Sequence, residues 1–410
     1  MRWDFHHEGY WDHESISSVG IFREVGEGIR LPSISSGGSH QFQLLSENGD
    51  TLWLSHLSTL WTDYLTTPPA REKAATFQAS IRFPLLAGAE RIRLLSRVSG
   101  EWEAVFQMTL EGFQSPSTDP LPWVELNSDL QHDEEAFSLL LLGVDYEAGE
   151  YESLLLTAEK LTQGLLNTAP FDQFREKISI KLLRMEQDAG HWELENGIFG
   201  AQRYALPLAL HRLNQAVSGI GHHYKVVLWN NSTYLGGGIY QQVAALGAEN
   251  DYAQMIFIHE LGHLLADLAD EYYPLSVNEP SPPSFFLQWA PNVSKDLADL
   301  PWREDVNIKI PSRWNKVGYE QFMTGQEERM ASRSIQTKEA WDAFMQEENE
   351  QLEALLYPLD WEQQIGAFEG AGHQYQGYYR PQRDCKMFGY REIPFCLICQ
   401  TALQKMLQRY

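Results

Sequence analysis

The sequence has few of the features that mark a membrane-spanning or nucleic-acid-binding protein. No apolar run reaches the length of about 18 residues that a bilayer-spanning helix needs. Basic residues are scarce, since 31 Lys and Arg stand against 56 Asp and Glu, for a net charge of -25. A chain this acidic repels phosphate backbones and anionic lipids, so we expect no nucleic-acid partner.

Cysteine is also rare, and its placement is informative. Three cysteines in 410 residues exclude a disulfide scaffold, and all three lie near the C-terminal end, at Cys385, Cys396 and Cys399. They could form a structural metal site whose fourth ligand is unnamed, form one disulfide with a spare thiol, or stay reduced and buried. The sequence leaves these three alternatives open.

The N-terminal residues MRWDFHHEGYWDHES have neither a basic n-region nor an apolar h-region. They do not resemble a signal peptide. We therefore expect either that the protein stays inside the cell or that a leader precedes the sequence shown, and the location stays open.

The pattern of residue types along the chain predicts an all-β domain followed by an α/β domain. Residues 1–113 contain short runs rich in β-branched and aromatic residues, at the spacing of a β-sandwich. These runs are Gln41–Leu45, Thr51–Leu54, Thr76–Phe83, Arg91–Val98 and Trp102–Leu110. Residues 114–135 carry three prolines and many acids and are the predicted linker, and residues 136–410 form the second domain.

Strands and helices alternate in the first half of that second domain. The apolar runs Phe137–Leu142, Ile178–Met185 and Lys225–Trp229 predict buried strands. Helical spacing predicts helices over Glu150–Asn167 and Ala201–Ala216. This alternation predicts an α/β (α+β) domain.

The segment MIFIHELGHLLADLADEYY contains the motif H-E-x-x-H at His259, Glu260 and His263. On a helix, residues four apart share a face, so both imidazoles can bind one tetrahedral Zn²⁺. Glu260 is placed to take a proton from a zinc-bound water rather than to bind the metal. The apolar flanks predict a buried helix, which a chance match on the surface would rarely have.

The stretch HELGHLLADLADEYY resembles the signature of the IgA-peptidase family of zinc metallo-endopeptidases, which belongs with the metzincin-type peptidases. Other stretches are similar to family motifs in the same order, and the resemblance covers about residues 137–410. They are LLLGVDY at 140–146, Ala169-Pro170-Phe171, WNNSTYLGGG at 229–238, APNV at 290–293, YRPQRDCKM at 379–387 and FCLIC at 395–399. The N-terminal region resembles the family's accessory domain only in position and size. The family is usually exported, which the N-terminus of this sequence does not indicate.

The resemblance implies a metzincin-like architecture, with Met387 as the methionine of the turn beneath the zinc. It also implies that the glycines at 236–238 lead into an edge strand over Ile239–Ala245 that can pair with a peptide substrate; the alternative is a flexible turn. Tyr390 is a candidate for stabilising the oxyanion, although a packing role is the simpler expectation.

The third zinc ligand is expected just beyond the helix. In the family signature a glycine ends the helix and the ligand follows three residues later, which corresponds here to Asp267 and Asp270. Asp visits the left-handed conformation of that glycine less readily. Glu271, with its longer side chain, is the strongest competitor, and a distant acid or histidine is a further alternative. The simpler expectation is that Asp270 and Glu271 only cap and solvate the helix end.

These features together predict a zinc-dependent endopeptidase that acts on protein or peptide substrates. Its metal ligands would be His259, His263 and Asp270, and Glu260 would be its general base. The alternatives are an envelope or surface binding protein with a vestigial peptidase site, and a zinc hydrolase of non-peptide amides. Substrate and oligomeric state stay open.

Overall fold

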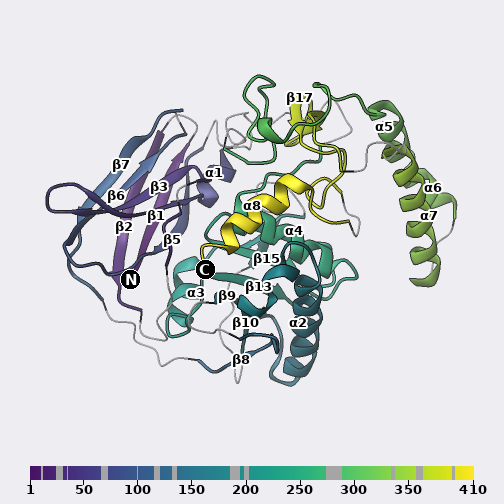
Figure 1. The fold of residues 1–410 in the computed structure, drawn as a ribbon. Coiled ribbons are helices and arrows are strands. Elements are labelled where there is room, and N and C mark those ends of the chain that lie inside the picture. Colours follow the sequence, from purple (N-terminus) through teal and green to yellow (C-terminus); the bar gives the residue numbers. More distant parts are fainter. Residues whose placement is uncertain are drawn as a thin grey trace. The chain divides into compact units, whose positions relative to one another are not determined.

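The computed structural model covers the whole chain (Figure 1). It describes residues 1–10, 13–24, 31–34, 36–65, 73–98, 100–114, 121–131, 136–184, 194–197, 203–273, 289–333, 338–356, 363–389 and 393–410. The chain divides into two compact units. The first comprises Met1–Asp267, Pro282–Trp289 and Thr401–Tyr410, and the second comprises Leu268–Ser281 and Ala290–Gln400.

Two antiparallel sheets form the beginning of the first unit. One has the strand order β2-β1-β5 and the other the order β4-β3-β6-β7. Their strands are β1 (Arg2–Tyr10), β2 (His13–Phe22), β3 (His40–Ser46), β4 (Thr51–Leu57), β5 (Ala75–Arg82), β6 (Ala89–Ser96) and β7 (Glu103–Thr109), with helix α1 (Leu60–Tyr64) after β4. Side chains from both sheets, including Trp3, Phe42 and Ile92, meet in one buried apolar cluster.

A six-stranded sheet of order β14-β15-β13-β9-β10-β8 follows in the same unit. Its strands are β8 (Trp123–Glu125), β9 (Phe137–Val144), β10 (Ile178–Leu183), β13 (Tyr224–Trp229), β14 (Gly236–Ile239) and β15 (Val243–Gly247). The four central strands are parallel to one another, and the edge strands β14 and β8 are antiparallel to their neighbours. Every residue of β9 and β10 is buried, as expected for strands covered on both faces.

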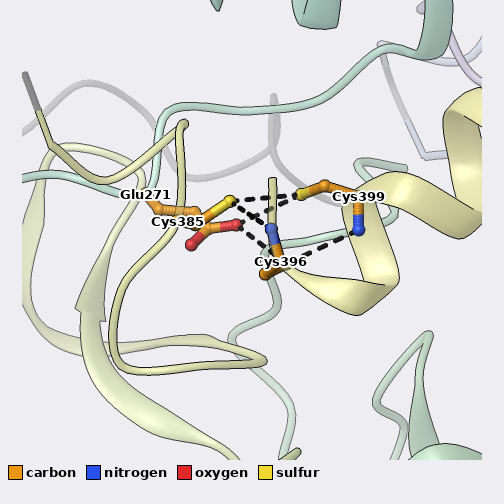
Figure 2. Close-up of side chains that lie close together, drawn as sticks. All are labelled: Glu271, Cys385, Cys396 and Cys399. Carbon is orange, nitrogen blue, oxygen red and sulfur yellow. Dashed lines mark hydrogen bonds between the residues drawn. The ribbon is translucent and has the colours of Figure 1, made fainter. Parts of the chain in front are cut away.

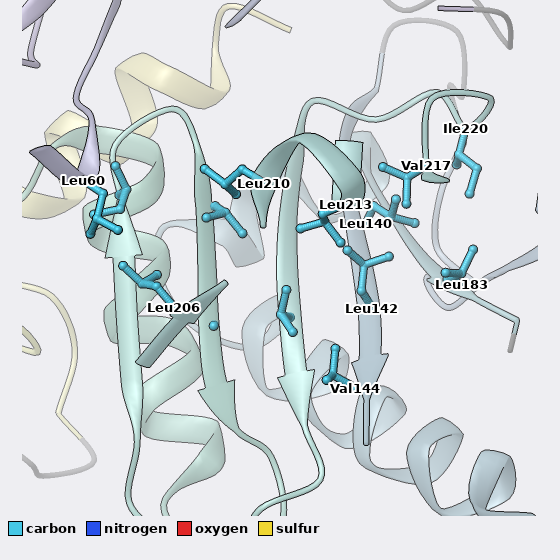
Figure 3. Close-up of a cluster of buried hydrophobic side chains, with 14 residues drawn as sticks. Leu60, Leu140, Leu142, Val144, Leu183, Leu206, Leu210, Leu213, Val217 and Ile220 are labelled. Carbon is cyan, nitrogen blue, oxygen red and sulfur yellow. The ribbon is translucent and has the colours of Figure 1, made fainter. Parts of the chain in front are cut away.

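Helices cover the two faces of this sheet. On one face, Leu140, Leu142 and Val144 of β9 share a buried apolar cluster with Leu210 and Leu213 of helix α3 (Leu210–Ala216), and Figure 3 shows Leu213 beside Leu140 and Leu142. Helix α4 (Ala253–Ala266) contacts β14 and β15, and helix α2 (Tyr151–Leu166) contacts α4 and β10. The short elements of this region are η3 (Ala148–Glu150), η4 (Phe171–Lys177) and the pair β11 (Leu194–Asn196) and β12 (Ala205–Pro207).

The second unit combines loops, a two-stranded sheet and helices. Its elements are η7 (Arg303–Asp305), α5 (Lys316–Thr324), α6 (Gln326–Ser332), α7 (Lys338–Leu356), β16 (Phe368–Ala371) and β17 (Gln374–Arg380). Helix α8 (Leu397–Leu407) begins in this unit and ends in the first. Among the described residues, no helix is both long and apolar enough to cross a membrane.

The mixture of helices and strands agrees with the prediction from the sequence. The structure corrects several details of that prediction. The five strands predicted before residue 113 and the strands at 137, 178 and 225 are present within a few residues of the expected bounds. The helix predicted over Ala201–Ala216 is wrong in its first part, because β12 occupies Ala205–Pro207 and α3 begins only at Leu210. Pro207 cannot donate a helical hydrogen bond, which favours this break.

The two units reflect how the folded chain packs. They do not test whether residues 1–113 fold independently, so the predicted domain boundary stays a prediction. One observation qualifies the linker at 114–135. Strand β8 lies within it and pairs with β10 at the edge of the six-stranded sheet.

Candidate active site on helix α4

Helix α4 carries the H-E-x-x-H motif. Most of its side chains are buried, whereas His259 and His263 are only half-buried. Their Nε2 atoms lie 3.1 Å apart. Two imidazole nitrogens bound to one tetrahedral zinc lie about 3.3 Å apart. The histidine pair therefore fits a shared metal ion.

Glycines of the edge strand β14 make room for Glu260, which is 8% exposed. A Cβ atom on Gly236 would lie 2.5 Å from Oε1 of Glu260, closer than non-bonded atoms approach. One on Gly238 would lie 3.3 Å from Oε2 of Glu260 and 3.1 Å from Cβ of His263. Because alternate residues of a strand share a face, both glycines face the helix at its H-E-x-x-H motif. The glycine run was visible in the sequence, but this close approach was not.

The edge strand predicted over Ile239–Ala245 is placed wrongly, because the glycines themselves lie in the edge strand β14 and the strand that follows, β15, pairs on both sides with β14 and β13. One end of this edge is covered, since the backbone N–H of Gly236 donates to the carbonyl of Arg203 at 3.0 Å. Pairing of a peptide with the remaining edge stays a prediction.

Helix α4 ends at Asp267, which takes the left-handed conformation, with φ of 53°. The sequence made this conformation doubtful for an aspartate. The structure supplies its stabilisation, because the backbone N–H of Gly38 donates to Oδ2 of Asp267 at 2.7 Å. Burial raises the pKa of the Asp267 carboxyl to about 7, and the Gly38 hydrogen bond and the charge of Arg97 oppose that rise. The helix therefore ends in the left-handed conformation expected of a glycine, although Asp267 stands at this position.

Asp270 and Glu271 lie in the second unit and have different surroundings. The Asp270 carboxylate is 16% exposed, and its Oδ2 lies 3.1 Å from Nε2 of His373. Glu271 is fully buried, and its Oε1 accepts a hydrogen bond from Nδ2 of Asn292 at 3.0 Å. The sequence analysis missed His373, and no motif marks it. An imidazole beside a carboxylate is a common outer-shell partner of a metal ligand.

The three cysteines lie together in the second unit, around Glu271 (Figure 2). Burial raises the pKa values of the Glu271 carboxyl and of the Cys385 and Cys399 thiols. Met387 is fully buried, and its carbonyl accepts a hydrogen bond from the Glu271 backbone at 2.8 Å.

Two of the predicted roles in this region remain untested. The assignment of Met387 to a turn beneath the metal stays a prediction. Tyr390 lies outside the described residues.

A mixed α/β fold with paired imidazoles and a buried glutamate on one helix is the arrangement expected of a metal-dependent hydrolase. The sequence matches the family described as IgA peptidase M64 over residues 193–407, more than half of the chain. The chain belongs to this family of metallopeptidases, so it is a peptidase, a hydrolase whose substrates are proteins. No curated protein matches the chain. The motifs at 140–146 and 169–171 precede the matched stretch and stay a resemblance.

Proposed function

We propose that the protein is a zinc-dependent endopeptidase in which His259, His263 and Asp270 bind the metal. The observation that carries the proposal is the pair of Nε2 atoms 3.1 Å apart on the helix that also holds Glu260. Bound zinc would supply Lewis acidity, which polarises the scissile carbonyl and lowers the pKa of water. Glu260 is the general base that takes a proton from water and delivers it to the leaving amine.

Asp270 is the proposed third ligand because it follows helix α4 closely in the chain and because its carboxylate is partly exposed. It lies three positions after the helix cap Asp267, so their Cα atoms are at most about 11 Å apart. Glu271 is fully buried and hydrogen-bonded to Asn292, which leaves the partly exposed Asp270 to face a metal.

The substrate is proposed to bind along β14 as an added strand. In an antiparallel strand, alternate residues direct their backbone groups to the same side. The N–H of Gly236 points away from the sheet, toward Arg203, so Gly238 directs its own N–H and C=O to that outer side. An extended peptide paired there would pass the end of the strand that faces Glu260 and His263.

We also propose the metzincin-like architecture for the catalytic region and an accessory β-sandwich for residues 1–113. The order of motifs supports the first, together with the left-handed turn at Asp267 after the active-site helix. The second rests on two antiparallel sheets that share one apolar cluster.

Hydrolysis of casein, an unstructured protein, tests the proposed function. The purified full chain should bind zinc and cleave casein internally, a chelator should abolish cleavage, and added zinc should restore it. Release of single terminal residues alone would contradict an endopeptidase. Metal binding with no cleavage of any peptide would favour a vestigial site or a hydrolase of other amides.

A further inference from the structure

We propose that Cys385, Cys396, Cys399 and Glu271 form a second, structural zinc site. The family assignment concerns the peptidase, and this inference goes beyond it and does not depend on activity at helix α4. All four donor atoms lie within 4.8 Å of one another, and all four residues belong to the second unit (Figure 2). Three thiolates and one carboxylate are a donor set that suits tetrahedral Zn²⁺.

The distances between the donor atoms match that geometry. Tetrahedral zinc holds two sulfur ligands about 3.8 Å apart and a sulfur and an oxygen ligand about 3.6 Å apart. The Sγ atoms of Cys385 and Cys399 are 3.7 Å apart. Oε1 of Glu271 lies 3.4 Å from Sγ of Cys399 and 3.9 Å from Sγ of Cys396. None of the three cysteines forms a disulfide.

The backbone around the thiols is arranged as it is around zinc-bound thiolates. Cys396 and Cys399 stand three residues apart where helix α8 begins, a common spacing of zinc-binding cysteine pairs. The backbone N–H of Cys396 donates to Sγ of Cys385 at 3.2 Å, and that of Cys399 donates to Sγ of Cys396 at 3.5 Å. Such outer-shell hydrogen bonds orient ligands and stabilise their negative charge.

Burial and charge point to a bound cation. Glu271, Cys385 and Cys399 are fully buried and Cys396 is 5% exposed, so the cluster has no open position for a substrate. Among the described residues, Oε2 of Glu271 has no hydrogen-bond partner, an arrangement that is destabilising if nothing replaces the partner. A metal ion would bind this carboxylate. Four anionic ligands exceed the charge of Zn²⁺, and the fully buried guanidinium of Arg380 supplies a compensating positive charge.

The proposed site joins three separate segments of the second unit. Glu271 directly follows Asp270, Cys385 lies two residues before Met387, and the other cysteines begin helix α8. The backbone hydrogen bond from Glu271 to Met387 ties two of these segments together already. Metal binding would therefore hold the segment that presents the proposed catalytic ligand Asp270.

Cobalt substitution tests the site, because a thiolate bound to Co²⁺ gives a charge-transfer band in the near ultraviolet that nitrogen and oxygen ligands do not give. All three cysteines of the chain lie in this cluster, so any such band must come from it. Full chain stripped of metal should bind two equivalents of Co²⁺ and show the band. Binding without the band would overturn the proposal.

Variants assign the band to the four residues. Cys396→Ser/Cys399→Ser should lose the band and one equivalent, whereas His259→Ala/His263→Ala should keep the band and lose the other. Glu271→Gln should weaken the band-forming affinity at least about tenfold. Glu348→Gln, which changes another buried glutamate of the same unit, should leave it unchanged. Equal effects of both glutamine variants would contradict a ligand role for Glu271.

A measurement on the wild-type chain covers the case in which the cysteine variants do not fold. A mercurial reagent that blocks thiols should release one equivalent of zinc as the three thiols react, detected with a zinc-sensitive dye. Release of no zinc when all three thiols have reacted would overturn the proposal.

Discussion

The donor groups on helix α4 and those around Glu271 differ in nearly every property that matters to a metal site. The first is built on nitrogen donors that are half-buried beside the edge strand β14. The second has sulfur donors that are buried with Glu271. A catalytic zinc keeps one position open for water, and a structural zinc is closed by four protein ligands. One chain therefore has the donors for both kinds of site, and exposure and donor type distinguish the two sites.

The largest effect on activity is expected from a change that removes the basicity of Glu260. Glu260→Gln keeps the shape of the side chain and removes its basicity, so peptide turnover should fall by about 100- to 10,000-fold while the metal stays bound. Asp251→Asn, which changes an exposed acid just before the same helix, is the matched control and should retain activity. Casein cleavage and metal content are measured on both. Full activity of Glu260→Gln would contradict the mechanism.

The next effect distinguishes two adjacent acids. Asp270→Ala should weaken the zinc that supports activity by more than about 100-fold, because even outer-shell changes cost about 10- to 100-fold. Glu271→Ala should leave that zinc largely in place and affect the cysteine site instead. Competition with a chelator of known affinity measures both. The reverse pattern would transfer the catalytic role to Glu271.

A third group, His7, Glu14 and His40, also brings two histidines beside a carboxylate. Nε2 of each histidine lies near Oε2 of Glu14, at 3.0 and 3.2 Å, and the other ring nitrogens are hydrogen-bonded to Thr59 and Ser39. Burial lowers the pKa of His7 to about 4. Since the unfolded chain takes up this proton near pH 6.5, the stability that His7 contributes is present above that pH and is lost as the pH falls toward 4.

This loss should amount to about 3 kcal/mol in the free energy of unfolding. Denaturant unfolding at several pH values should therefore show a fall from pH 6.5 to 4, with a smaller slope in His7→Gln. The slope should be the same with and without chelator. A slope that disappears on metal removal would show that this cluster binds a metal too.

The smallest expected effect concerns the contact between β14 and helix α4. Gly236→Ala places a methyl group against the Glu260 carboxylate, which can move because it ends a flexible side chain. Turnover should fall about tenfold, since small misplacements of catalytic groups are costly. Gly149→Ala, at a glycine with open space around it, should have no effect. Unchanged turnover in Gly236→Ala would remove Gly236 from the positioning of Glu260.

The parts of the molecule that the sequence predicted depend on local patterns. Spacing of four residues sufficed for His259 and His263, and continuous apolar runs sufficed for the buried strands. Strand β1 was not predicted, because its buried residues include Arg2 and Asp4, which form an ion pair at 2.9 Å and make the strand look polar. A pattern of apolar alternation cannot detect such pairs.

The features that the sequence did not predict depend on contacts between residues far apart in the chain. Glu271 stands more than a hundred residues before Cys385, so the sequence left the fourth donor of the cysteine cluster unnamed. Asp267 was a poor candidate for a left-handed turn until Gly38, far away in the sequence, was seen to donate to its carboxylate. His373 beside Asp270 had no sequence signal at all. Each case requires tertiary structure that brings separate segments together.

The most direct test of two zinc sites of opposite design is X-ray absorption at the zinc edge on the full chain. The account predicts a shell of nitrogen or oxygen at about 2.0–2.1 Å together with a sulfur shell at about 2.3 Å. The sulfur shell should persist in His259→Ala/His263→Ala and vanish in Cys396→Ser/Cys399→Ser. A zinc-loaded wild-type spectrum without sulfur, or with sulfur alone, would contradict it.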